Sequence, residues 1–218
     1  MTQPTSERAA FSGRRKPSRG PVLPLVLIAL VIVALLAAYT LARPRLVLAN
    51  RLVAPVRVTV GDRSRTVAAG QSLDIPTSWR KNETVVWELI RPLSADGKPM
   101  GEAVRGSLAV RGRWGAIHGS TSARGLEGNY FAPLITNTSN DLLRVTVNAG
   151  LEGALDCGCA VRPDARRAFI GYYRLYVNST VQAKAGDKSA VFTDLGSKVV
   201  SRDGTIGLRF SSEDLRAP

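Results

Sequence analysis

Residue types that carry most enzyme chemistry are scarce in this chain of 218 residues. It has one histidine, His118, and two cysteines, Cys157 and Cys159. The sequence contains no G-x-S-x-G, H-E-x-x-H or phosphate-binding-loop pattern, and its carboxylates form no paired motif. Hydrolase and nucleotide-binding functions therefore lack support. We predict a protein that is not an enzyme, with no catalytic residue, no metal site and no cofactor.

Acidic residues are also few, since 30 Lys and Arg face 17 Asp and Glu and the formal net charge is +13. Beyond residue 45 these cations are spread along the chain, and no basic run is longer than two residues. A nucleic-acid-binding protein concentrates its charge in a patch or stripe. The charge therefore does not predict a nucleic-acid partner.

A long apolar run lies near the N-terminus. Residues 22–42 contain no charged side chain and consist mainly of Leu, Val, Ile and Ala. A helix of this length spans roughly 30 Å, the thickness of a bilayer's hydrocarbon core. We predict a transmembrane helix over residues 21–43. A cleaved signal peptide is the alternative, but its apolar core is typically only about 7 to 15 residues long.

The tail before this run, residues 1–20, is short and basic, and includes Arg14, Arg15 and Lys16. Short basic segments tend to stay in the cytoplasm, whereas long domains cross the membrane largely regardless of their charge. We therefore expect a single-pass protein of the bacterial inner membrane. Its tail is cytoplasmic and binds anionic lipid headgroups, and its C-terminal part is periplasmic.

After residue 45 the pattern changes to short alternating runs separated by Gly, Pro, Asn and Asp, which is typical of half-buried strands. The predicted strands cover residues 46–50, 56–60, 84–90, 142–147, 169–177, 190–195 and 205–210. No stretch beyond residue 45 has a helical period. The fold class is therefore all-β.

An internal repeat refines this prediction. Asn50 and the run over residues 56–60 recur 87 residues later as Asn137 and residues 143–147, without gaps. The repeat predicts tandem β-sandwich-like units, built either as two lobes or as one larger sandwich. We expect the first unit over residues 46–104, a Gly- and Arg-rich connection over 105–130, and the second unit over 131–218.

The two cysteines form a Cys-Gly-Cys motif. Outside the cytoplasm such a pair commonly oxidises, and the intervening glycine permits the tight turn of a disulfide between Cys157 and Cys159. Two alternatives remain: a thiol redox centre, or a copper site using both thiolates, for which other soft ligands are scarce.

Tyr and Arg suit protein interfaces because they bury a large area and keep polar contacts. Strand alternation places Tyr172, Arg174 and Tyr176 on one face, and Trp114 lies in the Gly-rich connection. With Arg14, Arg15 and Lys16 of the tail, these residues are the candidate interface.

The layout of basic tail, single apolar segment and β domain resembles that of accessory single-pass subunits of bacterial photosynthetic reaction-centre and light-harvesting complexes. The apolar segment has no histidine to ligate a pigment. The resemblance implies a structural subunit whose partners are other transmembrane subunits. The alternative is a membrane-tethered periplasmic metal or redox module that uses Cys157 and Cys159.

Overall fold

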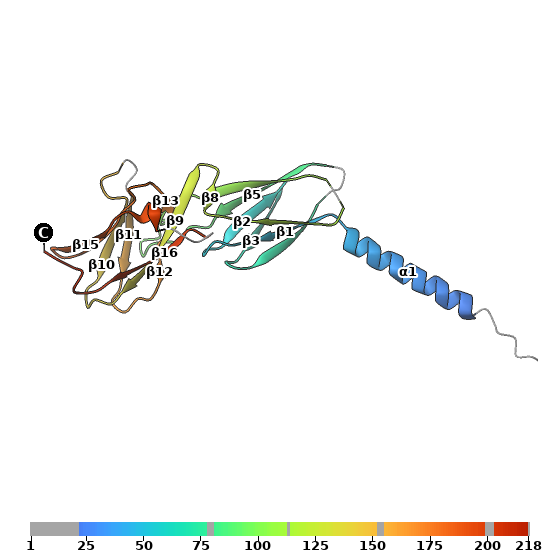
Figure 1. The fold of residues 1–218 in the computed structure, drawn as a ribbon, viewed down its shortest axis with the longest axis horizontal. Coiled ribbons are helices and arrows are strands. Elements are labelled where there is room, and N and C mark those ends of the chain that lie inside the picture. The colour runs from blue at the N-terminus through green and yellow to red at the C-terminus, as the bar shows by residue number, and fades with distance from the viewer. Residues whose placement is uncertain (1–21, 78–80, 113, 152–154, 199–202, 218) are drawn as a thin grey trace, which may run out of the picture. The chain divides into compact units, whose positions relative to one another are not determined.

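The computed structural model describes residues 22–77, 81–112, 114–151, 155–198 and 203–217. The chain divides into two compact units, residues 1–42 and 43–218, and each is described by itself. The first contains helix α1 (Val22–Ala42), and the second is built almost entirely of strands (Figure 1). The predicted β class is therefore correct for the part of the chain that follows the helix.

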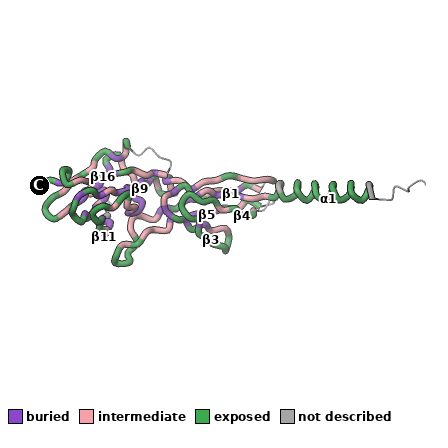
Figure 2. Tube along the Cα trace, turned by 90° about the horizontal axis from the view of Figure 1, so that it is seen from below, coloured by how far each residue is buried: buried purple, intermediate pink, exposed green. Residues whose placement is uncertain are grey.

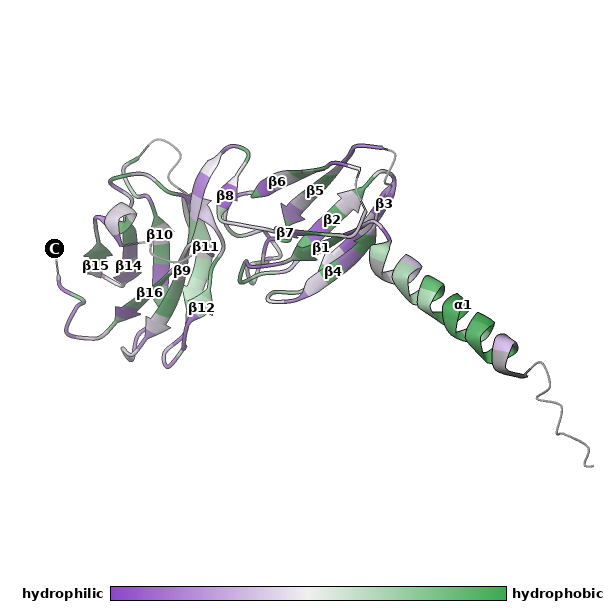
Figure 3. Cartoon of the chain, turned by 45° about the vertical axis from the view of Figure 1, so that its right-hand side comes forward, coloured by the Kyte–Doolittle hydropathy of each residue, from purple (hydrophilic) through white to green (hydrophobic). Residues whose placement is uncertain are grey.

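Helix α1 is apolar on all sides. The side chains of residues 24–40 are all exposed, and Ala42 at the end of the helix is half-buried (Figures 2 and 3). Across the described residues, no helix combines the length and the apolarity that crossing a membrane requires. The transmembrane segment therefore stays a prediction. The predicted tail residues Arg14, Arg15 and Lys16 lie outside the described residues.

The first seven strands form one lobe, which we call the first lobe. They are β1 (Arg45–Ala49), β2 (Val56–Val60), β3 (Arg63–Val67), β4 (Ser72–Pro76), β5 (Glu83–Leu89), β6 (Arg105–Val110) and β7 (Ala116–Ser120). They pair as two sheets, with the orders β4-β1-β7 and β3-β2-β5-β6. Both sheets contribute side chains to one hydrophobic cluster, so the lobe is sandwich-like.

The remaining strands form the second lobe around a separate hydrophobic cluster. They are β9 (Gly128–Asn137), β10 (Leu143–Val147), β11 (Leu155–Val161), β12 (Ala168–Phe169), β13 (Tyr173–Arg174), β14 (Val181–Ala185), β15 (Lys188–Phe192) and β16 (Thr205–Phe210), with the short 3₁₀ helix η1 (Leu195–Ser197). One sheet has the order β11-β10-β14-β15, and β9 pairs with β12, β13 and β16 in the other. Strand β8 (Arg124–Gly125) forms a tight hairpin with the start of β9.

The two lobes have the same strand pairing, which supports the internal repeat. In each lobe the first strand is antiparallel to the fourth and parallel to the last, as in β1 with β4 and β7, and β9 with β12 and β16. The second strand lies between the third strand and a later one, as β2 lies between β3 and β5 and β10 lies between β11 and β14. Because the first and last strands are parallel, each repeat begins at one end of its sheet and finishes at the other.

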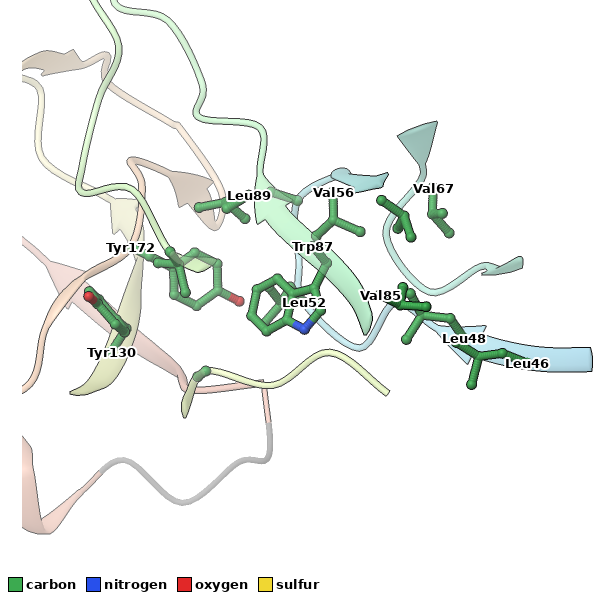
Figure 4. Packing of buried hydrophobic residues seen from close by; sticks show 14 of the residues in the cluster. Leu46, Leu48, Leu52, Val56, Val67, Val85, Trp87, Leu89, Tyr130 and Tyr172 are labelled. Carbon is green, nitrogen blue, oxygen red and sulfur yellow. The ribbon is translucent and has the colours of Figure 1, made fainter. Parts of the chain in front are cut away.

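The core of the first lobe depends on the alternation of its strands. Trp87 of β5 is 3% exposed and lies directly opposite Gly106 of β6. A Cβ atom at Gly106 would lie 2.2 Å from the indole ring, so only glycine lets the ring lie across β6. Figure 4 shows Trp87 beside Leu52 and Val85 within this cluster.

A buried asparagine amide closes the end of each sandwich. The Asn50 side-chain NH₂ donates to the carbonyl oxygens of Ala54 and Val67, and its Oδ1 accepts from the Leu52 amide. Asn137 repeats these bonds 87 residues later, to Asp141, Val161 and Ser139. In both lobes the asparagine side chain joins the segment just before the second strand to the end of the third strand. Asn50 and Asn137, which are identical in the two repeats, therefore have a structural role.

Tyr172 joins the two lobes. Its ring is fully buried in the cluster of the first lobe, at the end that contains Leu52 and Trp87 (Figure 4). Its hydroxyl donates to the Asp203 carbonyl at 2.8 Å and accepts from the Val53 amide at 3.3 Å. These bonds connect a loop of the first lobe to the segment before the last strand of the second.

Glu102 reinforces this junction from the long loop between β5 and β6. Its amide donates to the Tyr172 carbonyl at 2.7 Å, and its carboxylate accepts from the Arg174 amide at 2.8 Å. Gly101 has φ +73°, and a Cβ there would lie 2.6 Å from the Tyr172 carbonyl oxygen. The junction therefore consists of close backbone contacts, which favours a fixed arrangement of the two lobes.

Several predicted boundaries were wrong. The segment expected to be a connection, residues 105–130, forms β6, β7 and β8, and the first two complete the first lobe. The predicted strand over residues 169–177 is divided into β12 and β13, because Gly171 has φ +114° and interrupts the alternation. The predicted strands at 56–60 and 205–210 match β2 and β16.

Replacing Asn50 by Ala should strongly destabilise the β unit. The change leaves buried donors and acceptors unpaired at a cost of about 1–3 kcal/mol each, so we expect a loss of at least about 3 kcal/mol in the free energy of unfolding. Urea denaturation followed by circular dichroism measures it. The control is Asn140→Ala, because Asn140 is exposed. Equal stability of the two variants would contradict the proposed role.

Tyr172 should make the protein sensitive to alkali. Burial raises the pKa of the Tyr172 hydroxyl well above its ordinary value of 10. Above about pH 10 the unfolded chain loses this proton while the folded protein retains it, so stability is complete below that pH and falls as the pH rises. Tyr172→Phe should lower stability at neutral pH by about 1–3 kcal/mol, because the Val53 and Asp203 groups lose their partner.

The same variant should also show a shallower loss of stability between about pH 9 and 11. Denaturant titrations at both pH values measure this slope. Tyr176→Phe is the control, since Tyr176 is only half-buried. An alkaline slope identical in Tyr172→Phe and the parent protein would refute the assignment.

Candidate functional site: a groove between the sheet edges of the first lobe

A groove of about 550 Å³ opens in the first lobe where β3 and β4 face each other. These are edge strands: among the described strands, β3 pairs with β2 alone and β4 with β1 alone. The lining residues are Val58, Val60, Gly61, Asp62, Arg63, Arg65, Leu73, Asp74, Ile75, Pro76, Glu83 and Thr84. The groove thus has apolar walls from both sheets and charged groups at its margin.

Two arginines on β3 project from the inner face of their sheet. Arg65 lies directly opposite Val58, and Arg63 opposite Val60. Directly opposed residues of an antiparallel pair share a face, and Val58 is buried in the core. Neither guanidinium forms an ion pair with a residue that the structure describes. The groove therefore contains two guanidinium groups that are available to a ligand.

Charged residues that point inward from an edge strand discourage unspecific pairing with other chains. Such pairing is the main hazard of an exposed edge, because its backbone N–H and C=O groups are unpaired. A partner that adds a strand to β3 must therefore also satisfy Arg63 and Arg65. This requirement makes the groove selective.

The third strand of the second lobe carries the two cysteines at the spacing of the two arginines. Val67 pairs with Val56 in β2, and Val161 pairs with Leu143 in β10, at equivalent places in the repeat. Two and four residues before Val67 are Arg65 and Arg63, and two and four residues before Val161 are Cys159 and Cys157. The register of β10 and β11 shifts between Arg144 and Thr146, so Leu155 lies opposite Val147, whereas Arg63 lies opposite Val60. The two pairs therefore share their distance from the end of the third strand but not their pairing partners.

The two cysteines form a disulfide, with their Cα atoms 5.1 Å apart. Cys157 is 6% exposed and belongs to the core of the second lobe, and Cys159 packs against that core. This arrangement offers no free thiolate for copper. Among the described residues, no group of three or more His, Cys, Asp or Glu side chains is placed to hold a metal ion.

The chemistry of the groove is suited to binding an extended peptide. Val58, Val60, Leu73 and Ile75 provide an apolar wall, and the edge of β3 provides unpaired backbone groups. Arginine can donate two parallel hydrogen bonds to a carboxylate. Asp62, Asp74 and Glu83 also line the groove, so its charge is mixed. A ligand with apolar side chains and a single carboxylate would satisfy these features.

The structure separates the residues of the predicted interface. Tyr172 is fully buried between the lobes, so its side chain is not available to another protein in this structure. Arg174 and Tyr176 are half-buried. Trp114 is 55% exposed in the loop between β6 and β7. The structure therefore does not bring these four residues together on one surface.

Sequence reasoning missed Arg63 and Arg65. The signal was present, because the alternation of Val67, Arg65 and Arg63 has the same spacing as that of Val161, Cys159 and Cys157. The hairpin between β10 and β11 is longer than the one between β2 and β3, so the offset of 87 no longer aligns the third strands. An alignment without gaps therefore hides the correspondence.

No protein-family model matches the chain, and a search of curated proteins finds no match. The function must therefore be argued from the groove, the helix and the repeat.

Removing the disulfide should weaken the second lobe without abolishing its fold. The bridge closes a very short loop, so its loss should cost about 2 kcal/mol. We expect Cys157→Ala with Cys159→Ala to lower the free energy of unfolding by about this amount, measured in urea. Treating the parent protein with dithiothreitol should reproduce the loss. An effect of the reductant on the double variant would show that it acts elsewhere.

Proposed function

We propose that this chain is a non-catalytic assembly subunit of a bacterial membrane complex, and that the groove of its first lobe binds an extended segment of a partner subunit. Residues 22–42 anchor the chain in the inner membrane. The N-terminal tail lies in the cytoplasm, where its cations meet anionic headgroups, and the β unit lies in the periplasm.

The composition of α1 supports the anchor. Its 21 residues include no charged side chain, and residues 24–40 are exposed on every side. A helix that is apolar all round is stable when lipid or protein surrounds it, and not when it faces water. Neighbouring transmembrane helices would be its partners within the membrane.

The observation that carries the binding function is the groove between two sheet edges of the first lobe, with Arg63 and Arg65 on its lining. The third strand of the second lobe instead carries a disulfide that packs against the core of that lobe. Two arginines contribute less to an apolar core than a disulfide does. Their presence at the groove is better explained by binding than by stability.

The proposed occupant is an extended segment that pairs with the edge of β3. Its alternate side chains would be apolar and rest on Leu73 and Ile75, and one carboxylate would reach Arg63 or Arg65. Strand addition of this kind takes affinity from backbone hydrogen bonds and specificity from side-chain pockets. The layout resemblance makes a photosynthetic complex the first assembly to examine.

Photo-crosslinking in native membranes tests this proposal. A photoreactive residue in place of Leu73 or Ile75 should crosslink the full-length chain to one partner segment, at sites that follow the two-residue period of a strand. Adding Arg63→Ala and Arg65→Ala should reduce the yield at least tenfold. Mass spectrometry of the crosslinked peptides identifies the partner.

The matched control is Arg57→Ala with Arg144→Ala. Both residues are exposed, and they occupy equivalent places in β2 and β10, away from the inner face. This pair should leave the crosslink unchanged. Crosslinks to lipid alone, to many unrelated proteins, or with equal yield in both double variants would overturn the proposal.

A further inference from the structure

One end of the first lobe combines basic residues with an exposed tryptophan. We call it the entry end, because β1 begins there. It carries Arg43, Arg63, Lys81, Arg111 and Trp114. Strand pairing places these residues at one end. In one sheet, Arg45 at the start of β1 lies opposite Pro76 at the end of β4 and Ala116 at the start of β7. In the other sheet, Glu83 at the start of β5 lies opposite Val110 at the end of β6.

The entry end faces away from the second lobe. The second lobe meets the first at the opposite end of its strands, where Tyr172 contacts Val53 in the loop after β1. The entry end is therefore not covered by the described part of the second lobe.

The chemistry of the entry end suits a lipid surface. Its four cations are exposed, and two carboxylates, Asp62 and Glu83, lie beside them. Lysine and arginine near a membrane are attracted to anionic headgroups, and tryptophan is enriched at the interface between water and hydrocarbon. Trp114 has more than half of its surface exposed.

The length of the connection to α1 restricts where this end lies. The helix ends at Ala42 and β1 begins at Arg45. Three residues span at most about 10 Å even when fully extended. The headgroup region on each side of a bilayer is roughly 5–8 Å thick. If Ala42 ends the span at the hydrocarbon boundary, the chain is too short to hold β1 far from the headgroups.

We propose that the entry end is a second membrane-binding surface, in which Lys81 and Arg111 contact anionic headgroups and Trp114 lies at the interface. The inference rests on the proposed anchor at residues 22–42. It concerns the β unit and is separate from the basic N-terminal tail.

Tryptophan quenching by brominated lipids tests the contact. The full-length chain is reconstituted in vesicles of brominated phosphatidylcholine, with or without one third phosphatidylglycerol. The difference between the parent protein and Trp114→Phe isolates the signal of Trp114. We expect strong quenching of that signal, and stronger quenching with phosphatidylglycerol. Exposure of Trp114 to water with no quenching in either vesicle would overturn the inference.

Charge reversal separates a specific surface from general attraction. Lys81→Glu with Arg111→Glu should reduce the quenching of Trp114 to less than half in vesicles that contain phosphatidylglycerol. The matched control reverses two exposed cations of the second lobe, Arg162 and Lys184, and should leave the quenching unchanged. An equal loss in both double variants would show non-specific attraction and refute the surface.

Flotation after an alkaline wash distinguishes the two proposals. A chain that stays with the vesicles while Trp114 is unquenched retains its anchor, and only the entry-end surface is wrong. A chain that is released from the vesicles lacks the anchor, which overturns both. Retention with quenching that depends on phosphatidylglycerol supports both.

Discussion

The buried asparagine amide is the interaction on which each lobe depends. In each lobe the chain passes from one sheet to the other between the first and second strands, and part of the backbone of this connection is buried. Its buried carbonyl groups need hydrogen-bond donors. Asn50 and Asn137 each supply two such donors from one side-chain amide, and the Oδ1 of each accepts from the backbone amide two residues further on. The position of the second strand, and of the hairpin built on it, follows from these bonds.

Two lobes with the same frame have acquired different edges. In the second lobe the third strand carries a disulfide that packs against the core. In the first lobe the third strand carries Arg63 and Arg65, which line the groove between β3 and β4. The same pairing of strands is therefore compatible with a closed edge in one lobe and an open edge in the other.

The sequence predicted the repeat and the β class because both depend on local alternation, which residues 56–60 and 143–147 display without interruption. It did not predict β9, where Pro133 and two asparagines resemble a turn although the strand is largely buried. Tyr172 illustrates a second limit. Strand periodicity placed it on one face with Arg174 and Tyr176 as a candidate interface, whereas Gly171 turns the chain and places the ring in the core of the other lobe. The groove lies between β3 and β4, which follow each other in the sequence but belong to different sheets, so the alternation within either strand does not reveal the opening between them.

Strand β9 belongs to both cores: Tyr130 and Ala132 pack in the first cluster, and Phe131 and Ile135 in the second. Load applied between the lobes would therefore pass along one continuous strand. Its parallel ladder with β16 extends from Ala132 to Asn137. Tension along such a ladder shears several hydrogen bonds at once and does not peel them one by one. The protein would consequently resist stretching at the junction and transmit mechanical force from one lobe to the other with little extension.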